Sequence, residues 1–314
     1  MRPPSPHRPD LCKKAPSLSI GNIAMGGRGK TPAVMHLARL LLDAGERPAV
    51  LSRGYGRRVV EPGVVVVSDG CHLRADLDRS GDEPLLIARG VPGASVFVCE
   101  QRAIARTLAT SAFGATVTLL DDGFQHRQVA RDVDLVLVSS ADLRDRPLPF
   151  GRLRESVRAL DRADAVIAVD DEARAALETN TNRPTFSLAR AIGEPAPLEI
   201  DRPWPAGRGR VVAVAGIAQP QRFESALAAA GWTVTRLMSF PDHHRYRRAD
   251  VERIAAAVRE TNAIGVLTTE KDAVRLRWMR PLQVAIAAAP LAASIEPAAS
   301  FRPWLLDRLR EARA

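Results

Sequence analysis

A glycine-rich segment that contains one lysine and one threonine gives the clearest sign of chemistry in this sequence. It follows a short apolar run, Ser17–Ile20, and opens a stretch with helical spacing. In a P-loop, backbone amides at a helix N-terminus hold phosphates, the lysine bridges the outer phosphates and the hydroxyl binds Mg²⁺. We therefore expect an ATP site formed by Gly26, Gly27, Arg28, Gly29, Lys30, Thr31 and Pro32.

The segment departs from the strict P-loop pattern at one position. Ala24 stands where the pattern has its first glycine, and we expect Gly26 and Gly27 to supply the flexibility instead. The alternative is a turn that only joins a strand to a helix. Lys30 favours the P-loop, because it is one of only four lysines in a chain with 45 basic residues.

An acidic pair follows a second apolar run, Val117–Leu120. Asp121 and Asp122 stand where a Walker B carboxylate meets Mg²⁺, at the carboxyl end of a buried strand. Together with the P-loop, they predict a Mg²⁺–nucleoside triphosphate site but do not identify the phosphate acceptor. A guanine-specific Asn-Lys-x-Asp motif is missing, since the similar residues at 269–272 have a different spacing, which argues against a GTPase.

Composition limits the classes of partner. The chain has 314 residues, with 45 basic and 36 acidic side chains and a formal net charge of +9, which suits an anionic partner. Aromatic residues make up 4% and are not interleaved with basic residues, so we expect no nucleic-acid partner. Three scattered cysteines, Cys12, Cys71 and Cys99, favour a reducing compartment. Met1–Lys14 lacks the apolar stretch of a signal peptide, and no run is long enough to span a bilayer.

Short Val- and Leu-rich runs alternate with helical stretches along the chain. This pattern predicts an α/β fold with a parallel sheet covered on both faces. We expect a P-loop NTPase-like domain over residues 1–187, a Pro-, Asn- and Gly-rich connector over 188–209, and a smaller α/β domain over 210–314. An amphipathic helix over 301–313 is expected to close the core, packing back on the first domain; the alternative is a contact with a membrane surface.

Further polar clusters follow several predicted strands. Ligands of open α/β sheets collect outside the carboxyl ends of the strands, so these clusters can converge on one crevice. They are the segments 52–56, 80–84, 122–126, 147–155, 240–244 and 267–272.

With the segment 19–32, and in this order along the chain, these motifs resemble the tetraacyldisaccharide 4′-kinase family, the lipid A 4′-kinases of Gram-negative bacteria. The resemblance implies ATP-dependent phosphorylation of the 4′-hydroxyl of a tetraacylated glucosamine disaccharide 1-phosphate. It also implies two α/β domains with the active site between them, and peripheral association with the cytoplasmic face of the inner membrane. No protein partner is expected.

The resemblance also assigns roles to individual residues. Lys30 would bind the β- and γ-phosphates, and Asp82 would be the catalytic base, working with His243 of the second domain. Arg154 would neutralise charge on the transferred phosphoryl group. Thr31, Asp121, Asp122 and Glu155 would hold Mg²⁺ directly or through water.

Each role has a simpler structural alternative. Asp82 could be a helix N-cap, and Arg154 with Glu155 a solvated ion pair. Arg53 and His126 are weaker candidates for the same cleft. The sequence assigns no role to His244, and Lys271 could be a salt-bridge partner.

These motifs also fit a function of another class. The alternative to a kinase is a P-loop ATPase switch that regulates membrane or partner binding. The pair Asp82 and His243 discriminates the two, because a switch positions only water whereas a kinase needs a base for an alcohol. The family usually has a longer, partly apolar N-terminal helix than Met1–Pro16 offers. Membrane docking would then use another surface, be weak, or be lost because the start is truncated. The candidates are the terminal helix and the arginines at 144, 146, 152, 154, 158 and 162.

Overall fold

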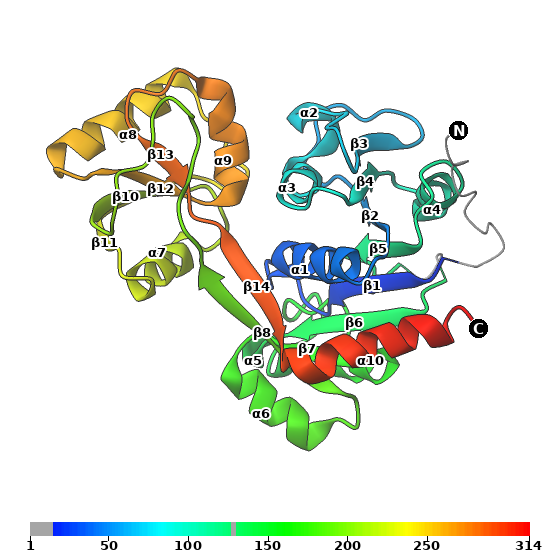
Figure 1. Ribbon diagram of the computed structural model, residues 1–314. Coiled ribbons are helices and arrows are strands. Elements are labelled where there is room, and N and C mark those ends of the chain that lie inside the picture. Colours follow the sequence, from blue (N-terminus) through cyan, green and yellow to red (C-terminus); the bar gives the residue numbers. More distant parts are fainter. Residues whose placement is uncertain (1–14, 127–129) are drawn as a thin grey trace, which may run out of the picture.

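The computed structural model describes residues 15–126 and 130–314, and their strands form two sheets (Figure 1). The expectations for Met1–Lys14, including Cys12, lie outside the described residues. The larger sheet has nine strands in the order β14-β8-β7-β6-β1-β5-β2-β4-β3, and the smaller has five in the order β11-β10-β12-β13-β9. Each sheet defines one lobe of the molecule.

The larger sheet is parallel except at its two edges. β3 runs antiparallel to β4, and β14 runs antiparallel to β8. Its strands are β1 Ser17–Asn22, β2 Pro48–Ser52, β3 Val65–Asp69, β4 Ser95–Val98, β5 Val117–Asp121, β6 Val133–Val138, β7 Ala165–Ala168, β8 Thr185–Ile192 and β14 Leu291–Glu296. The central strands β1 and β5 are buried along their whole length, as the continuous apolar runs predict.

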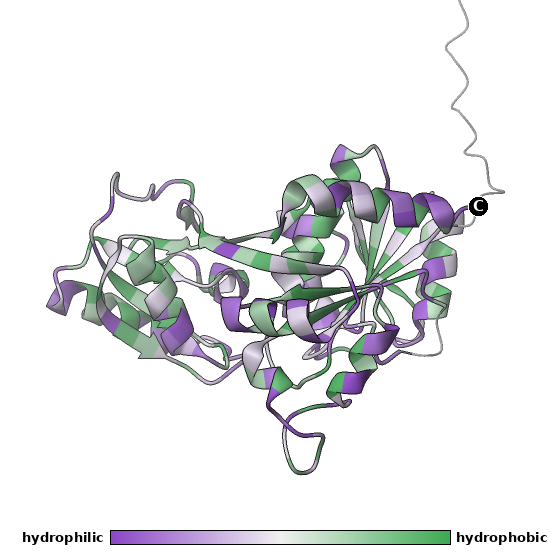
Figure 2. Cartoon of the chain, turned by 90° about the horizontal axis from the view of Figure 1, so that it is seen from below, coloured by the Kyte–Doolittle hydropathy of each residue, from purple (hydrophilic) through white to green (hydrophobic). Residues whose placement is uncertain are grey.

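Helices cover both faces of this sheet. One face packs against α1 Lys30–Asp43, α3 Asp82–Gly90 and α10 Ala298–Glu311, whose apolar residues share one core with the strands. The other face packs against α4 Arg102–Ser111, the 3-10 helix η1 Val157–Arg162 and α6 Asp171–Asn180. Two short helices, α2 Leu77–Ser80 and α5 Ser140–Leu143, complete the lobe. Figure 2 shows apolar residues gathered on the strands and hydrophilic residues toward the outer sides of the helices. The predicted α/β class is confirmed.

The second lobe is a smaller α/β layer. Its strands are β9 Ala196–Pro197, β10 Arg210–Ala215, β11 Thr233–Ser239, β12 Gly265–Thr268 and β13 Ile286–Ala288, all parallel to their neighbours except β9. Its helices are α7 Pro220–Ala229, α8 Arg248–Glu260 and α9 Glu270–Leu276, which continues into the 3-10 helix η2 Arg277–Met279. In the described part of the chain, no helix combines the length and apolar character that crossing a bilayer requires.

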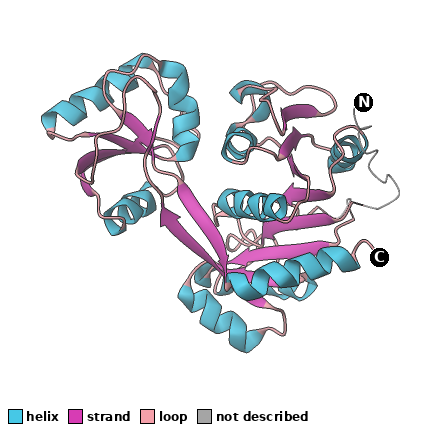
Figure 3. Ribbon diagram, in the orientation of Figure 1, coloured by secondary structure: helices cyan, strands magenta, loops and turns pink. Residues whose placement is uncertain are grey.

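The passage between the lobes differs from the predicted connector and from the predicted extent of the second domain. β8 continues to Ile192 inside the range 188–209, and β14 returns beside it in the larger sheet, with Ile192 opposite Leu291. Figures 1 and 3 show β8 and β14 running together between the lobes. The second lobe is therefore an insertion over 193–290. Local composition does not reveal this, because the partner of β8 lies about a hundred residues further along the chain.

The terminal helix α10 packs on the first lobe. Phe301, Leu305 and Leu309 are buried in the core of the larger sheet, and Phe301 contacts the ring of Phe186 edge-on. Its apolar face is thus covered by this chain, which leaves no apolar stripe on α10 for contact with a membrane.

Candidate active site

The glycine-rich loop joins β1 to α1. Gly29 precedes the first helical residue, Lys30, and has a φ of 87°, a left-handed conformation that strains residues with a side chain. Gly26 also has a positive φ, of 104°, and lies with Gly27 on the surface. The first turn of α1 presents Lys30 and Thr31, with Pro32 at a position that needs no amide donor. The loop therefore has the strand–loop–helix setting that a P-loop requires.

The side chain of Lys30 is held over the end of the sheet. Its Nζ lies 3.1 Å from Oδ1 of Asn22, the last residue of β1, and 2.9 Å from Oδ1 of Asp122. Gln125 in turn donates to the carbonyl oxygen of Asn22 at 2.9 Å. Sequence reasoning did not single out Asn22 or Gln125 as individual contacts. The place of Asn22, at the end of a strand that leads into the loop, was the available signal.

The side chain of Arg28 is bound within the protein. Its guanidinium is buried against Asp142, with Nε 2.9 and 3.0 Å from the two carboxylate oxygens. Asp142 is fully buried and also forms a capping box with Ser139 at the start of α5. The Arg28 side chain therefore ties the loop to α5. Ala24 is likewise buried, and it bridges to Leu153 in the segment that carries Arg154.

The two acids at the carboxyl end of β5 lie next to this loop. Asp121 is buried and accepts a hydrogen bond from Ser52 at 3.3 Å. Asp122 has a φ of 54° and contacts both Lys30 and Arg154, the latter at 2.8 Å. A non-glycine residue in the left-handed region carries a backbone cost that is typical of functional sites.

Electrostatics distinguish the two carboxyl groups. Burial, together with the charges of Glu83 and Asp122, raises the pKa of Asp121 to about 7. Burial acts in the same direction on Asp122, but Lys30 and Arg154 outweigh it and lower the pKa of that group. Ionisation of Asp121 is unfavourable in these surroundings. A divalent cation beside it would stabilise its charged form.

The donor set suits Mg²⁺ held together with phosphate. Asp121, Asp122 and the hydroxyl of Thr31 offer the hard oxygen ligands that this ion prefers. Among residues 15–126 and 130–314, no group of three or more His, Cys, Asp or Glu side chains could hold a metal ion by itself. Mg²⁺ is usually bound by one or two carboxylates plus substrate phosphates, so the residues present fit an ion that arrives with the nucleotide.

Arg154 and Glu155 have separate surroundings. The backbone amides of both lie near the carbonyl oxygen of Ile23, at 2.7 and 3.4 Å, which fixes this segment beside the P-loop. Arg154 points to Asp122 and also lies 3.3 Å from the amide oxygen of Gln125. The carboxylate of Glu155 accepts from Arg162 at 2.6 Å. The structure thus brings Arg154 to the nucleotide loop and engages Glu155 with an arginine.

Asp82 and His243 meet across the two lobes. Asp82 is the first residue of α3, and its Oδ2 lies 2.8 Å from Nδ1 of His243, 161 residues further along the chain. His243 has a φ of 60°, and its ring packs edge-on against Tyr55 at 5.8 Å between centroids. The neighbouring His244 instead bonds Asp250 of its own lobe at 3.0 Å. The structure therefore separates the two histidines that the sequence left side by side.

A third residue, Arg275, contacts the same carboxylate. It is 3% exposed, and its Nη2 donates to Oδ2 of Asp82 and lies 3.3 Å from Nδ1 of His243. Its Nη1 is held by Asp272 at 3.1 Å, and Tyr246 donates to the same Asp272 oxygen at 2.9 Å. Sequence reasoning missed Arg275. Its only signal was helical spacing, three residues after Asp272 and four after Lys271.

These contacts influence the charges of Asp82 and His243, the pair that we call the dyad. Burial acts to raise the pKa of Asp82, but hydrogen bonds from His243 and Arg275 outweigh it and lower the pKa to about 2. The hydrogen bond to Asp82 is in turn the main reason why the pKa of His243 is raised. The contact therefore favours the charged forms of both groups, carboxylate and imidazolium.

Other ion pairs join the lobes beside the dyad. Lys271 pairs with Glu83, and Arg245 lies 2.8 Å from Asp78. The two remaining candidates lie on the first lobe: Arg53 is exposed, and His126 lies 3.4 Å from Arg102. Burial and nearby arginines lower the pKa of His126.

Comparisons with known proteins agree on one family. A family model described as Tetraacyldisaccharide-1-P 4'-kinase, LpxK, matches residues 9–310. Tetraacyldisaccharide 4'-kinase of Syntrophus aciditrophicus is 38% identical over 320 residues, which cover 94% of this chain and 84% of that protein. The enzyme of the same name from Rhodopseudomonas palustris strain TIE-1 is 39% identical and covers 95% of this chain and 86% of its own.

A solved structure is similar over nearly the whole chain. It is the crystal structure of the "apo" form of LpxK from Aquifex aeolicus in complex with ATP, with a TM-score of 0.75 and 31% identity. The similarity covers 94% of this chain and 89% of that one.

Proposed function

Because this chain belongs to the tetraacyldisaccharide-1-P 4'-kinase family, we propose that its cleft transfers the γ-phosphoryl group of ATP to the 4′-hydroxyl of a tetraacylated glucosamine disaccharide 1-phosphate. The chain is a kinase and binds ATP, and we propose that the loop over Gly26–Thr31 is the place where ATP binds. The observation that carries the proposed acceptor chemistry is the contact between Asp82 and His243 across the lobes. A nucleotide-dependent switch has no need of such a pair.

The nucleotide half of the reaction uses the first lobe. Loop amides and the N-terminus of α1 would hold the β- and γ-phosphates. Lys30 would neutralise the negative charge that develops on the leaving oxygen. Arg154 would neutralise the charge on the phosphoryl oxygens. To do so, its guanidinium would leave Asp122 and bind those oxygens. Mg²⁺, when bound, supplies charge neutralisation between the phosphates, and Asp121, Asp122 and Thr31 are the residues that would hold it.

The acceptor half uses the dyad. His243 and Arg275 both form hydrogen bonds with Oδ2 of Asp82. Within the described part of the chain, no residue forms a hydrogen bond with Oδ1. Oδ1 is therefore the atom that would accept the proton of the 4′-hydroxyl as its oxygen attacks phosphorus. His243 fixes the carboxylate through Oδ2, which sets the direction in which Oδ1 points.

The test is direct transfer of label. Protein, ATP labelled on the γ-phosphate and tetraacyldisaccharide 1-phosphate are incubated in nonionic detergent, and the lipids are separated. We expect a labelled bisphosphorylated lipid that depends on the acceptor. Label released only as inorganic phosphate, with or without the lipid, would instead indicate an ATPase switch.

We also propose docking on the anionic cytoplasmic face of the inner membrane, through the loop 147–153. Phe150 is 85% exposed and Leu148 52% exposed, beside Arg146. Most other arginines of the predicted basic run are neutralised, since those at 144, 152, 154 and 162 pair with acidic residues. Cosedimentation with vesicles that contain anionic lipid should weaken on Phe150→Asp; equal binding by the two proteins would contradict this docking surface.

A further inference from the structure

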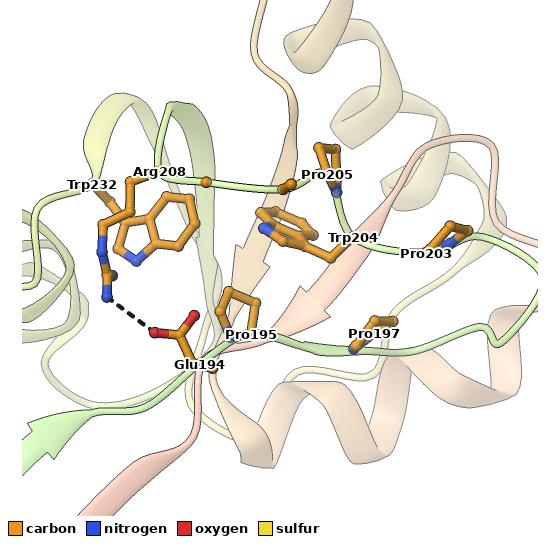
Figure 4. Close-up of a pocket in the computed structure, with 10 residues that line it drawn as sticks. Glu194, Pro195, Pro197, Pro203, Trp204, Pro205, Arg208 and Trp232 are labelled. Carbon is orange, nitrogen blue, oxygen red and sulfur yellow. Dashed lines mark hydrogen bonds and ion pairs between the residues drawn. The ribbon is translucent and has the colours of Figure 1, made fainter.

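Arginines of the second lobe differ in where their charge is compensated. Arg208 borders a surface hollow of about 580 Å³, where it lies over the ring of Trp232 at 5.2 Å and pairs with Glu194 of the same lobe at 3.2 Å (Figure 4). Arg275 is instead 3% exposed and contacts one carboxylate of each lobe. Because its charge is out of reach of water, Arg275 depends on these two carboxylates for compensation.

The edge of Arg275 that faces its own lobe is fixed in place. Its Nη1 lies 3.1 Å from Oδ1 of Asp272 and 3.3 Å from the carbonyl oxygen of Gly216. Asp272 is fully buried and accepts a hydrogen bond from the amide of Gly216 at 2.9 Å. The hydroxyls of Thr269 and Tyr246 also donate to Asp272, at 2.6 and 2.9 Å. The second lobe therefore sets the plane of the guanidinium through its own contacts.

The other edge of Arg275 reaches the first lobe. Its Nη2 donates to Oδ2 of Asp82, the oxygen that also lies 2.8 Å from Nδ1 of His243. A carboxylate that is held through one oxygen by a single hydrogen bond can still rotate about its bond to Cβ. Two partners with separate anchors, one in a loop and one in α9, restrict this rotation. The direction in which Oδ1 points is thereby fixed.

Arg275 and His243 differ as partners of Asp82. Burial acts to lower the pKa of Arg275, but the hydrogen bond to Asp82 and nearby negative charge outweigh it and raise the pKa. The guanidinium therefore stays charged at every pH at which the protein is folded. His243 is 34% exposed, and its imidazole loses its charge as the pH rises through its own raised pKa. Arg275 is thus the partner that still favours the ionised form of Asp82 when His243 is neutral.

Other charged groups lie around this carboxylate without holding it. Lys271 of α9 pairs with Glu83 of α3. Asp242 lies 3.8 Å from Nε2 of His243. In the part of the chain that the structure describes, neither Lys271 nor Asp242 forms a hydrogen bond with Asp82. Among the described residues, removal of the buried guanidinium would therefore leave the imidazole as the one side chain that is hydrogen-bonded to this carboxylate.

Given the proposed function, we propose that Arg275 is a positioning residue for phosphoryl transfer, which anchors Oδ2 of Asp82 to the second lobe and keeps Oδ1 directed at the acceptor hydroxyl. The proton of that hydroxyl passes to Oδ1, and Arg275 itself neither gains nor loses a proton. The role requires the fork of arginine, because one nitrogen is bound to Asp272 while the other holds Asp82. A lysine ammonium has one nitrogen and cannot take both positions.

The kinetic test replaces Arg275 in the full chain by methionine and by lysine. Arg275→Met removes the charge and the fork but keeps an unbranched side chain. We expect its kcat for transfer of labelled phosphate to the lipid to fall about 10- to 100-fold, as for a charged hydrogen bond that is lost, with the KM for ATP unchanged. Arg275→Lys keeps the charge without the fork, so its kcat should lie between those of Arg275→Met and the unaltered protein.

Proton affinities supply a readout that a merely structural role would not move. The hydrogen bond to Asp82 raises the pKa of His243, whereas the charge of Arg275 acts to lower it. NMR should therefore show a higher pKa for His243 in Arg275→Met and a nearly unchanged one in Arg275→Lys. Burial acts to raise the pKa of Asp82, and loss of one of the two hydrogen bonds that oppose burial should raise it above about 2. On the acid side, kcat of Arg275→Met should then begin to fall at a higher pH than kcat of the unaltered protein.

Arg245→Met is the matched control, because Arg245 also joins the lobes, through Asp78 at 2.8 Å, but is exposed and does not contact the dyad. It should change neither kcat nor the pKa of His243. The positioning role would be refuted if Arg275→Met kept more than half of the kcat. It would also be refuted if kcat fell equally in both variants of Arg275 while the pKa of His243 stayed the same.

Two further outcomes are decisive. If Arg275→Met did not fold, Arg275→Lys would decide: an unchanged kcat would refute the role of the fork, and a lower kcat with the KM for ATP unchanged would support it. If the unaltered protein transferred no label to the lipid, the proposed function would fail, and this role with it. Transfer by the unaltered protein and by Arg275→Met alike would refute the role of Arg275 alone and leave the kinase function standing.

Discussion

Replacing Asp82 by asparagine tests the dyad most sharply, because it removes charge and basicity while keeping the shape of the side chain. Oδ2 of Asp82 is contacted by two side chains of the second lobe, His243 and Arg275. Arg275 is almost fully buried and would keep only Asp272 as an anionic partner, so water cannot compensate for the loss of the Asp82 charge. We expect effects on both stability and rate.

The effect on stability follows from the pKa of Asp82. The pKa is about 2 in the folded protein and 3.8 ordinarily, and the side chain is 11% exposed. A difference of nearly two units corresponds to about 2 kcal/mol. Because the folded pKa is depressed, this contribution is complete above the unfolded pKa and disappears as the pH falls toward 2. Asp82→Asn should therefore lower the free energy of unfolding by about 2 kcal/mol at pH 7, with the difference vanishing in acid.

The effect on rate follows from the role of the base. Loss of a general base lowers kcat by about 10²- to 10⁴-fold. ATP affinity should be nearly unchanged, since Lys30 and Arg154 are held by Asp122 and not by Asp82. The assays are transfer of labelled phosphate to the lipid, nucleotide titration and urea unfolding at several pH values.

A matched control is available on the preceding helix. Asp78 of α2 also pairs with an arginine of the second lobe, Arg245, but both side chains are more than 40% exposed. Asp78→Asn therefore removes one charge pair between the lobes without touching the dyad, and a surface pair contributes at most about 1 kcal/mol. If Asp82→Asn kept more than a tenth of the wild-type rate, or lost no more than Asp78→Asn, the assignment of Asp82 as base would be wrong.

Three other predictions follow from the same geometry. Lys30→Ala should weaken ATP binding and lower the rate together, measured by nucleotide titration and initial rates; an unchanged ATP affinity would argue against the P-loop contact. Arg28→Ala leaves Asp142 as a buried, unpaired charge and should cost about 3–5 kcal/mol in urea unfolding, whereas a loss below 1 kcal/mol would show that the pair does not anchor the loop. The pKa of His243, followed by NMR, should lie above 6.5 and fall toward that value in Asp82→Asn. Its raised folded pKa means that its stabilising effect is present at low pH and is lost as the pH rises through that pKa, so a pKa below 6.5 in the unaltered protein would contradict the ion pair.

Local sequence was enough to predict the elements whose signals lie within a few residues. The loop Gly26–Thr31 opens α1, and the apolar run Val117–Leu120 forms β5 with Asp121 at its end, as predicted. In each case the glycine conformation, the strand burial and the helical spacing are properties of one short segment.

Contacts between distant segments could not be predicted from these patterns. Arg28 meets Asp142 across 114 residues of chain, and Arg275 meets Asp82 across 193. Neither arginine differs in its local sequence from the many others in a chain that uses arginine almost exclusively as its basic residue. Which arginine reaches which carboxylate is decided by packing, and only the fold reveals it.

The antiparallel pair of β8 and β14 gives the second lobe an unusual place in the covalent chain. Gly193 donates its amide hydrogen to the carbonyl oxygen of Pro290 at 2.8 Å, immediately beyond the pairing of Ile192 with Leu291. In topological terms, residues 193–290 replace the tip of a β-hairpin. A two-residue turn that joined β8 directly to β14 would therefore keep every strand of the larger sheet, in its order, without the second lobe.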